Sequence, residues 1–253
     1  MTESVILVHG LRTSATMWRA QVEYLTARGI SARAIDLPGH GSRIGERFTL
    51  DAAAVAISDA VAAETAATGI RPYLVGFSLG GYLSIDWVAR NPGRVSGLLA
   101  ASCGTVPNRL VMRVWRLLAW AIHTLPDRGR RLNDFAVHLF VPQPGAADII
   151  AGGVALEVMD DVLTDLLRLT PIASLRRIAE PVLFVNGQLD HVGLQAGRFL
   201  AAAPDGRMVT VLRATHMVSA THPEAFCAAM MEGYTRATAT PGAARLPDGA
   251  HDW

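Results

Sequence analysis

The sequence predicts an α/β protein with an open, mostly parallel sheet that is flanked by helices. Three observations predict this fold class. Short continuous apolar runs rich in β-branched residues recur along the chain, as expected of strands buried on both faces. Stretches with helical patterns separate these runs, which is the rhythm of βαβ units. The chain has 253 residues, of which 51% are hydrophobic and 18% charged, so it can bury a sizeable core.

The N-terminal part alternates regularly. Its first apolar run, SVILVHG, is too short for a buried helix and is typical of a strand. Glycines and a proline mark LPGHGSR as a loop. An alanine-rich stretch then predicts a helix, with Asp51 as its N-cap. The predicted elements are a strand at 4–10, a helix near 17–28, a strand at 31–36, a loop at 37–43 and a helix at 51–67.

The second half resumes the same alternation after an interruption. Residues 105–171 carry helical patterns and no apolar run typical of a strand. Residues 237–253 are polar with glycine and proline, and predict a flexible tail. The other predicted elements are strands at 71–77, 95–102, 181–187 and 207–213, and helices at 79–91, near 193–203 and near 222–235.

Composition narrows the classes of partner and compartment. The formal net charge is +1 and every basic residue is arginine, so nothing favours a nucleic-acid partner. Cys103 and Cys227 stand in apolar surroundings without metal-ligand spacing, which predicts two buried free thiols and no metal site. The chain opens without a basic signal-peptide region and has no apolar run of bilayer length. We expect a cytoplasmic protein without a membrane span; its oligomeric state stays open.

The stretch VGFSLGGYLSIDW, residues 75–87, contains three glycines around one serine. Gly76-Phe77-Ser78-Leu79-Gly80 stands where a predicted strand meets a predicted helix. Glycine costs roughly 0.5–1 kcal/mol relative to alanine inside such elements, so three of them need a reason. A strained turn that presents a nucleophilic serine provides one. A phosphate-binding loop does not fit, because the chain has no lysine and no G-x-G-x-x-G pattern.

A serine nucleophile needs a base, and the base needs an acid to orient it. Asp190 directly follows the predicted strand PVLFV, and His216 directly follows the predicted strand RMVTVL. Because carboxyl ends of parallel strands meet at one edge of the sheet, these side chains and Ser78 should lie together. The sequence therefore predicts Ser78 as nucleophile, His216 as base and Asp190 as acid.

Other candidates for these roles have weaker positions. Asp36 also ends a predicted strand and is the one serious rival acid. Asp86 lies within the helix after Ser78 and should point away from the turn. The remaining histidines have other expected roles: His191 at the rim, His222 at a helix start, and His9 and His40 in shaping loops.

Five segments in this order carry a family resemblance: LVHGL (7–11), DLPGHGSR (36–43), VGFSLGGY (75–82), PVLFVNGQLD (181–190) and ATHMVS (214–219). The sequence resembles the α/β-hydrolase superfamily over residues 4–236. The resemblance implies a hydrolase core formed by residues 1–104 and 172–236, similar to compact members that lack two leading strands. It also implies a helical cap at 105–171, inserted before the strand that carries the acid.

The resemblance further implies an oxyanion hole made by the backbone N–H groups of Leu11 and Leu79. It implies a serine hydrolase that cleaves a small to medium, apolar carboxylic ester through an acyl-enzyme, without a cofactor. Candidate substrate contacts are Arg12, Phe77 and Trp115. The same triad also serves lactonases, thioesterases, carbon–carbon hydrolases and a lyase of the menaquinone-pathway type, and the fold also serves non-catalytic small-ligand receptors.

One stretch of the expected cap, residues 108–125, has two interpretations. Arg109, Arg113 and Arg116 share one helical face. The helix is either an ordinary amphipathic cover of the sheet or a wall of an acyl pocket in which Trp115 faces Ser78. The residues expected on its apolar face are Val111, Val114, Trp115, Leu118 and Ile122.

Overall fold

A six-stranded sheet forms the centre of the computed structural model, which describes residues 4–239. The strand order is β2-β1-β3-β4-β5-β6, and all five neighbouring pairs are parallel. The predicted open, parallel α/β fold is confirmed. The strands are β1 (Ser4–Val8), β2 (Ser31–Ile35), β3 (Tyr73–Phe77), β4 (Gly97–Ala101), β5 (Val182–Gly187) and β6 (Gly206–Val211).

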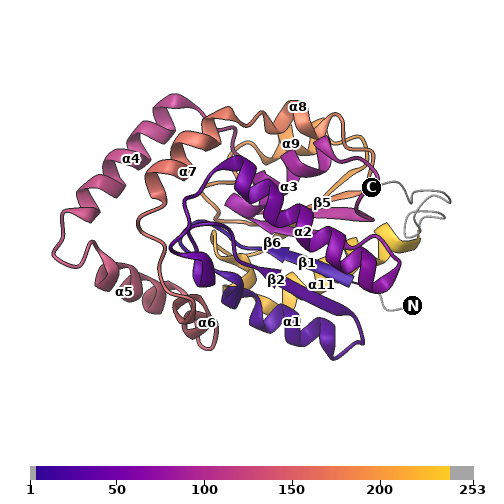
Figure 1. Cartoon of the computed structure of the whole chain (residues 1–253), viewed down its shortest axis with the longest axis horizontal. Coiled ribbons are helices and arrows are strands. Elements are labelled where there is room, and N and C mark those ends of the chain that lie inside the picture. Colours follow the sequence, from indigo (N-terminus) through magenta and orange to yellow (C-terminus); the bar gives the residue numbers. More distant parts are fainter. Residues whose placement is uncertain (1–3, 240–253) are drawn as a thin grey trace.

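Helices cover both faces of this sheet, as Figure 1 shows. Side chains alternate along each strand, so Ile6 and Val8 join one core while Val5 and Leu7 join the other. The first core includes α2 (Leu50–Thr68), α3 (Leu79–Arg90), α8 (Pro171–Leu175) and α9 (Ala196–Ala202). The second includes α1 (Arg19–Thr26), α10 (Val218–Thr221) and α11 (Pro223–Ala239).

The two cysteines belong to different cores. Cys103 packs on one side of the sheet and Cys227 on the other, and both are buried free thiols, as the sequence predicts. The sheet separates them.

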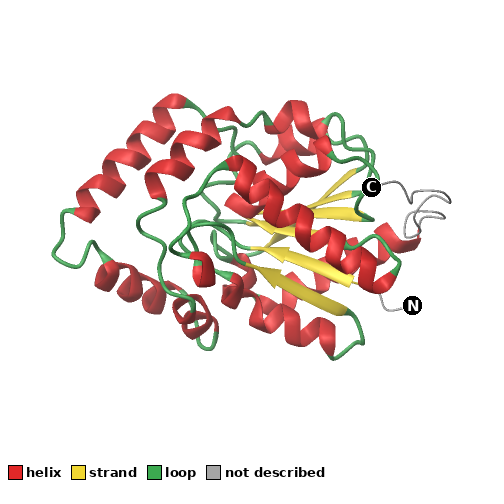
Figure 2. Cartoon of the chain, viewed as in Figure 1, coloured by secondary structure: helices red, strands yellow, loops and turns green. Residues whose placement is uncertain are grey.

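Four helices lie beyond the carboxyl ends of the strands, on the left of Figures 1 and 2. They are α4 (Arg109–His123), α5 (Arg130–Phe140), α6 (Gly145–Ala151) and α7 (Met159–Asp165). As predicted, residues 105–171 hold helices and no strand. In this group α4 packs against α7, and α6 packs against the short 3-10 helix at Ala15–Trp18.

The structure corrects three details of the elements. The N-cap of α2 is Thr49, whose hydroxyl oxygen accepts a hydrogen bond from the N–H of Ala52 at 3.1 Å, so Asp51 as N-cap is wrong. Asp51 instead lies in the first helical turn. The sequence also did not predict α10, and α11 continues to Ala239. Of the predicted tail, 237–239 thus belong to α11, and 240–253 lie outside the described residues.

The strand order places one crossover point in the middle of the sheet. From β1 the chain moves outward to β2, then returns to pair β3 on the other side of β1. Loops that leave β1 and β3 therefore diverge above their shared edge, and open α/β sheets bind ligands at such points. Within the described residues, no helix has the length and apolar character to cross a bilayer.

Candidate active site

Ser78 occupies a sharp turn between β3 and α3. Its φ of 52° and ψ of −114° lie where side chains other than glycine are rare. A Cβ on Gly76 would collide with the carbonyl of Gly80, and a Cβ on Gly80 would collide with the carbonyl of Val8. The glycines around Ser78 are thus required by the close approach of β1, β3 and α3.

The structure brings Ser78, His216 and Asp190 into one hydrogen-bonded line. The Nδ1 of His216 lies 2.9 Å from Oδ1 of Asp190, and its Nε2 lies 3.1 Å from Oγ of Ser78. Because a carboxylate only accepts, Nδ1 carries the proton and Nε2 is left to accept from the serine hydroxyl. These three residues follow the ends of β3, β5 and β6, as their sequence positions predict.

Asp190 is buried and held in its charged form. Burial alone would raise the pKa of this carboxyl, but hydrogen bonds from His216 Nδ1 and from the N–H of Val192, at 2.8 Å, outweigh it. The pKa of Asp190 is therefore below its ordinary value. A carboxylate in this state fixes the orientation of the imidazole and would stabilise a positive charge on it.

Two further side chains, those of Ser102 and Phe77, contact His216. Ser102 follows β4, has a φ of 52°, and donates a hydrogen bond from its hydroxyl to the carbonyl oxygen of His216 at 2.9 Å. Phe77 is 1% exposed, and its ring centroid lies 5.2 Å from that of His216. Phe77 as a substrate contact stays a prediction, although this burial favours a supporting role. Sequence reasoning missed Ser102, for which the only signal was a hydroxyl residue ending a predicted strand.

His191 lies between His216 of the triad and Trp115 on α4. Its ring centroid is 5.2 Å from that of His216 and 6.1 Å from that of Trp115. Burial, and then the neighbouring His216, lower the pKa of His191, so its neutral form is favoured. Trp115 is therefore two ring contacts away from the general-base candidate.

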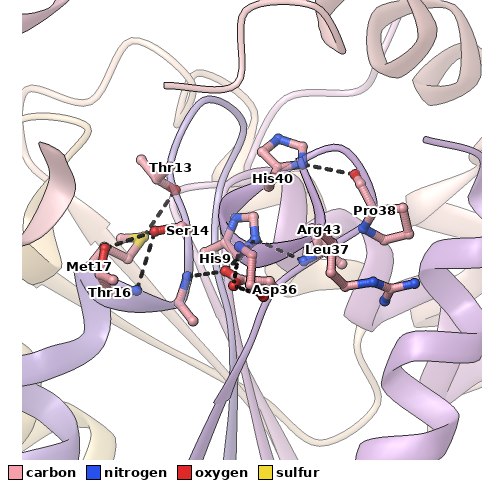
Figure 3. Close-up of polar contacts among 12 residues, drawn as sticks. His9, Thr13, Ser14, Thr16, Met17, Asp36, Leu37, Pro38, His40 and Arg43 are labelled. Carbon is pink, nitrogen blue, oxygen red and sulfur yellow. Dashed lines mark hydrogen bonds and ion pairs between the residues drawn. The ribbon is translucent and has the colours of Figure 1, made fainter. Parts of the chain in front are cut away.

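The rival residues Asp36, His9 and His40 form a separate cluster, drawn in Figure 3. Asp36 accepts hydrogen bonds from the N–H of Ala15 at 2.7 Å and from the N–H and hydroxyl of Ser42 at 2.9 and 2.8 Å. Both of its oxygens are thus used in holding loops. His40 is buried and bonded to the Pro38 carbonyl, and burial lowers its pKa. The carboxylate that contacts His216 is that of Asp190.

His9 organises the loop after β1. Its Nε2 accepts from the N–H of Leu37 at 3.0 Å, and its Nδ1 donates to the carbonyl of Gly10 at 2.7 Å (Figure 3). Burial is the main cause that lowers the pKa of His9 to about 3, followed by the nearby His40. The carbonyl of His9 also accepts from the N–H of Gly80 at 3.1 Å, which ties β1 to the start of α3.

The Gly10 carbonyl is fixed from two sides. Besides His9, Thr13 donates its hydroxyl to this oxygen at 2.9 Å. In a planar trans peptide the C=O and the following N–H point in opposite directions. Anchoring the Gly10 oxygen therefore fixes the direction of the Leu11 N–H. The Leu79 N–H begins α3, where N–H groups have no acceptor within the helix.

A small, partly open hollow lies beside this loop, under α4. Arg12 contributes to its wall, has a φ of 66°, and has a buried Nε without a hydrogen-bond partner among the described residues. Burial lowers the pKa of this guanidinium. Its other lining residues are Trp115, Leu118, Ala119, Ile122, His123 and Met159. No three His, Cys, Asp or Glu side chains in residues 4–239 are grouped so as to hold a metal ion.

Two curated relatives cover most of the chain. One, from Edwardsiella ictaluri, is a pimeloyl-[acyl-carrier protein] methyl ester esterase that is 28% identical over 258 residues, covering 90% of this chain and 92% of that protein. The other has the same name and comes from Aromatoleum aromaticum; it is 27% identical over 262 residues, covering 92% and 98%.

Solved structures give the same fold. A thermophilic esterase from Thermogutta terrifontis superposes with a TM-score of 0.74 at 20% identity, covering 94% of this chain and 91% of that one. The sequence model described as the alpha/beta hydrolase family matches residues 5–229. This match spans nearly all of the described residues, from β1 into α11, so the chain belongs to the alpha/beta hydrolase family.

Proposed function

We propose that this chain is a serine esterase that hydrolyses an apolar carboxylic ester. One observation carries the proposal: the imidazole of His216 lies 2.9 Å from the carboxylate of Asp190 and 3.1 Å from the hydroxyl of Ser78, which occupies a strained turn. A hydroxyl is a weak nucleophile at neutral pH, and this arrangement is one that activates it. In this proposal residues 105–171 act as a cap over a core formed by 1–104 and 172–236.

The reaction would proceed in two halves. Ser78 Oγ attacks the ester carbonyl while its proton passes to Nε2 of His216, and Asp190 stabilises the imidazolium. His216 then returns the proton to the leaving alcohol, and the acyl group remains on Ser78. In the second half, water gives a proton to His216 as it attacks the acyl carbon; the bond to Ser78 Oγ then breaks, His216 returns the proton to that oxygen, and the acid leaves.

The tetrahedral intermediates place negative charge on the former carbonyl oxygen. We assign the N–H groups of Leu11 and Leu79 as its hydrogen-bond donors. The supporting contacts are the anchored Gly10 carbonyl and the bond from the Gly80 N–H to the His9 carbonyl, which hold the two segments together. Donors that are fixed before the reaction stabilise the charge without reorganisation; removal of one such donor typically costs about 10²–10³ in kcat.

Apolar side chains of α4 near the triad support an apolar acyl group as the substrate class, since the ring of Trp115 contacts His191, whose ring contacts His216. Trp115, Leu118 and Ile122 offer such a group apolar surface, while Arg12 supplies one cationic group at the wall of the hollow. Two relatives are named for methyl esters of a pimeloyl group on acyl-carrier protein. We therefore propose a small to medium acyl ester as the substrate of this chain; such an ester can carry an anionic group that lies near Arg12.

A labelling experiment tests the nucleophile. The purified chain should react covalently with a fluorophosphonate probe and hydrolyse p-nitrophenyl esters. Ser78→Ala should abolish labelling and lower kcat by roughly 10³ or more, because only the oxyanion donors and binding remain. Ser96→Ala is the matched control, since it removes a buried hydroxyl just before β4, at the far end of that strand from the triad, and should keep the label.

Other outcomes would replace the proposal. Failure of folded wild-type protein to label, together with tight binding of an unreacted ester, would favour a non-catalytic receptor. Labelling without turnover of oxygen esters, but with turnover of lactones, thioesters or a carbon–carbon substrate, would keep the triad and change the substrate class.

A further inference from the structure

Helix α4 exposes a row of large apolar side chains on its outer side. Met112 and Ala119 are its buried residues, and the helix packs against α7. Successive residues of a helix are about 100° apart, so residues two positions away from a buried one lie on the opposite side. Leu110 and Val114 flank Met112 in this way, and Leu117 precedes Ala119 by two. These three side chains are 73%, 59% and 64% exposed.

In this respect α4 departs from an ordinary amphipathic helix. Such a helix turns its apolar side inward and its polar side to solvent. In α4 the arginines occupy only one flank, where Arg116 is bonded to Asp160. The other flank, with Trp115 and Leu118, lines the hollow. The outer side is left apolar, although Val114 was expected to face inward.

Helix α5 lies at the same end of the molecule as α4 (Figure 1), and it also exposes large apolar side chains. None of its residues is fully buried. We call the exposed apolar side chains of both helices, apart from Trp115 and Leu118 at the hollow, the α4–α5 surface. Its members are Leu110, Val114, Leu117 and Trp120 on α4, and Leu132, Phe135, Leu139 and Phe140 on α5.

The segment that carries the α4–α5 surface is itself positively charged. Residues 108–140 contain six of the chain's 23 basic residues but only two of its 22 acidic ones. Arg116 and Arg128 bind carboxylates of Asp160 and Glu157. For the other four, no ion pair is found among the described residues. These four are Arg109, Arg113, Arg130 and Arg131.

We infer that the α4–α5 surface docks this protein onto an anionic lipid membrane. Exposed leucine, tryptophan and phenylalanine beside arginine on helices is the composition of segments that lie in the membrane interface without spanning it. The apolar side chains would enter the acyl boundary, and the arginines would contact phosphate groups. A docked molecule would hold the hollow under α4 next to the lipid phase, from which apolar esters can be drawn.

Two other occupants fit less well. A second copy of this chain in a two-fold dimer would bring two cationic surfaces together, with like charges opposed. An acidic carrier protein would match the arginines, but it would leave the outer row of leucine and valine without an apolar partner. The lipid surface satisfies both the charge and the apolar row.

Vesicle flotation tests the inference with Ser78→Ala protein, so binding is read without turnover and independently of the proposed activity. The full chain should float with vesicles that contain about a quarter phosphatidylglycerol and bind weakly to phosphatidylcholine alone. Leu110→Glu with Leu117→Glu should lower the partition coefficient at least roughly tenfold. Arg109→Gln with Arg113→Gln should lower it roughly fivefold per charge, only on the anionic vesicles.

The matched control is Val55→Glu, which replaces an exposed apolar residue on α2, away from this surface. It should float like the parent, and the Leu110→Glu, Leu117→Glu protein should retain hydrolysis of a water-soluble short ester when Ser78 is present. Equal loss in Val55→Glu would overturn the inference. So would absence of flotation with either vesicle, a dimer in sedimentation velocity that Leu117→Glu dissociates, or binding to an acidic acyl-carrier protein alone.

Discussion

Asp190 and Asp36 both follow strands of the same sheet, yet only Asp190 lies against His216. Asp36 is bonded to Ala15 and Ser42 and serves the loops. Asp190→Asn should therefore lower kcat by roughly 10³–10⁴, because the amide no longer selects the productive tautomer of His216. Asp36→Asn should act mainly on stability. Hydrolysis rates with p-nitrophenyl esters compare kcat of the two variants, on protein whose circular dichroism is unchanged. A larger loss of kcat in Asp36→Asn than in Asp190→Asn would reverse the assignment of the acid.

Substitution of Thr13 tests the proposed oxyanion donor Leu11. Its hydroxyl holds the Gly10 carbonyl, and so the direction of the Leu11 N–H. Thr13→Val keeps the shape but removes the hydrogen bond. We expect kcat to fall by about 3–30-fold with little change in KM, since a misaligned donor weakens transition-state binding. Thr13→Ser should restore most of the loss. A rise in KM at constant kcat would instead assign Thr13 to substrate binding.

Sequence patterns sufficed to predict that three residues following strands lie close together, while their catalytic roles stay a proposal. Ser78, Asp190 and His216 each follow an apolar run, and parallel strands bring such positions to one edge. Thr13 and Ser102 could not be found this way, because their roles depend on which carbonyl each hydroxyl reaches in the folded chain. The prediction of Asp51 as N-cap is wrong because aspartate and threonine both cap helices, and only the backbone conformation identifies Thr49 as the cap.

At the scale of elements, the sequence pattern predicted the faces of α4 but not the direction in which they point. The arginine stripe could be read from the spacing, and Trp115, Leu118 and Ile122 do line the hollow. The outward direction of Val114 could not be read, because it depends on the packing of α4 against α7. Apolar periodicity gives the relative angles of side chains around a helix but not which angle faces the protein.

Substitution of Trp115 tests whether α4 forms a wall of an acyl pocket. An acyl chain that enters an apolar pocket gains about 0.8 kcal/mol for each buried CH₂. Specificity constants for p-nitrophenyl esters of about two to ten carbons should then rise roughly three- to fourfold per carbon until the pocket fills. Trp115→Ala should flatten this profile. Trp120→Ala removes an exposed tryptophan from the same helix and should leave it intact. Equal effects of both variants would reduce α4 to a structural cover.

For the whole molecule, the fold was largely predictable because most strands are short apolar runs and every crossover contains a helix. The order of the strands in the sheet lies beyond such patterns, since periodicity does not say which strands are neighbours. Helix α10 was missed because its four residues are too short for a periodic signal.

The stability of the whole molecule should fall in acid partly through His9. Its pKa is about 3 in the folded chain, because of burial, and near the ordinary 6.5 when unfolded. Between these values the unfolded chain binds a proton that the folded chain does not, so the free energy of unfolding falls as pH falls. This slope approaches about 1.4 kcal/mol per pH unit for one proton.

Urea unfolding at several values between about pH 6.5 and pH 4.5 measures it. His9→Asn should be less stable than wild type at neutral pH but should have a shallower dependence, by about one proton. Parallel curves for the two proteins would show that His9 does not set the acid response.

The helical segment between β4 and β5 divides the proposed machinery into two parts along the chain. Everything up to β4 carries the nucleophile and both oxyanion donors, whereas Asp190 and His216 come only after β5 begins. A cut in the loop between α4 and α5 would thus yield two polypeptides, each chemically incomplete. If each were fused to one of two interacting proteins, ester hydrolysis would arise only where the partners met. On the proposed mechanism, the order of its strands makes this enzyme a natural template for a split reporter.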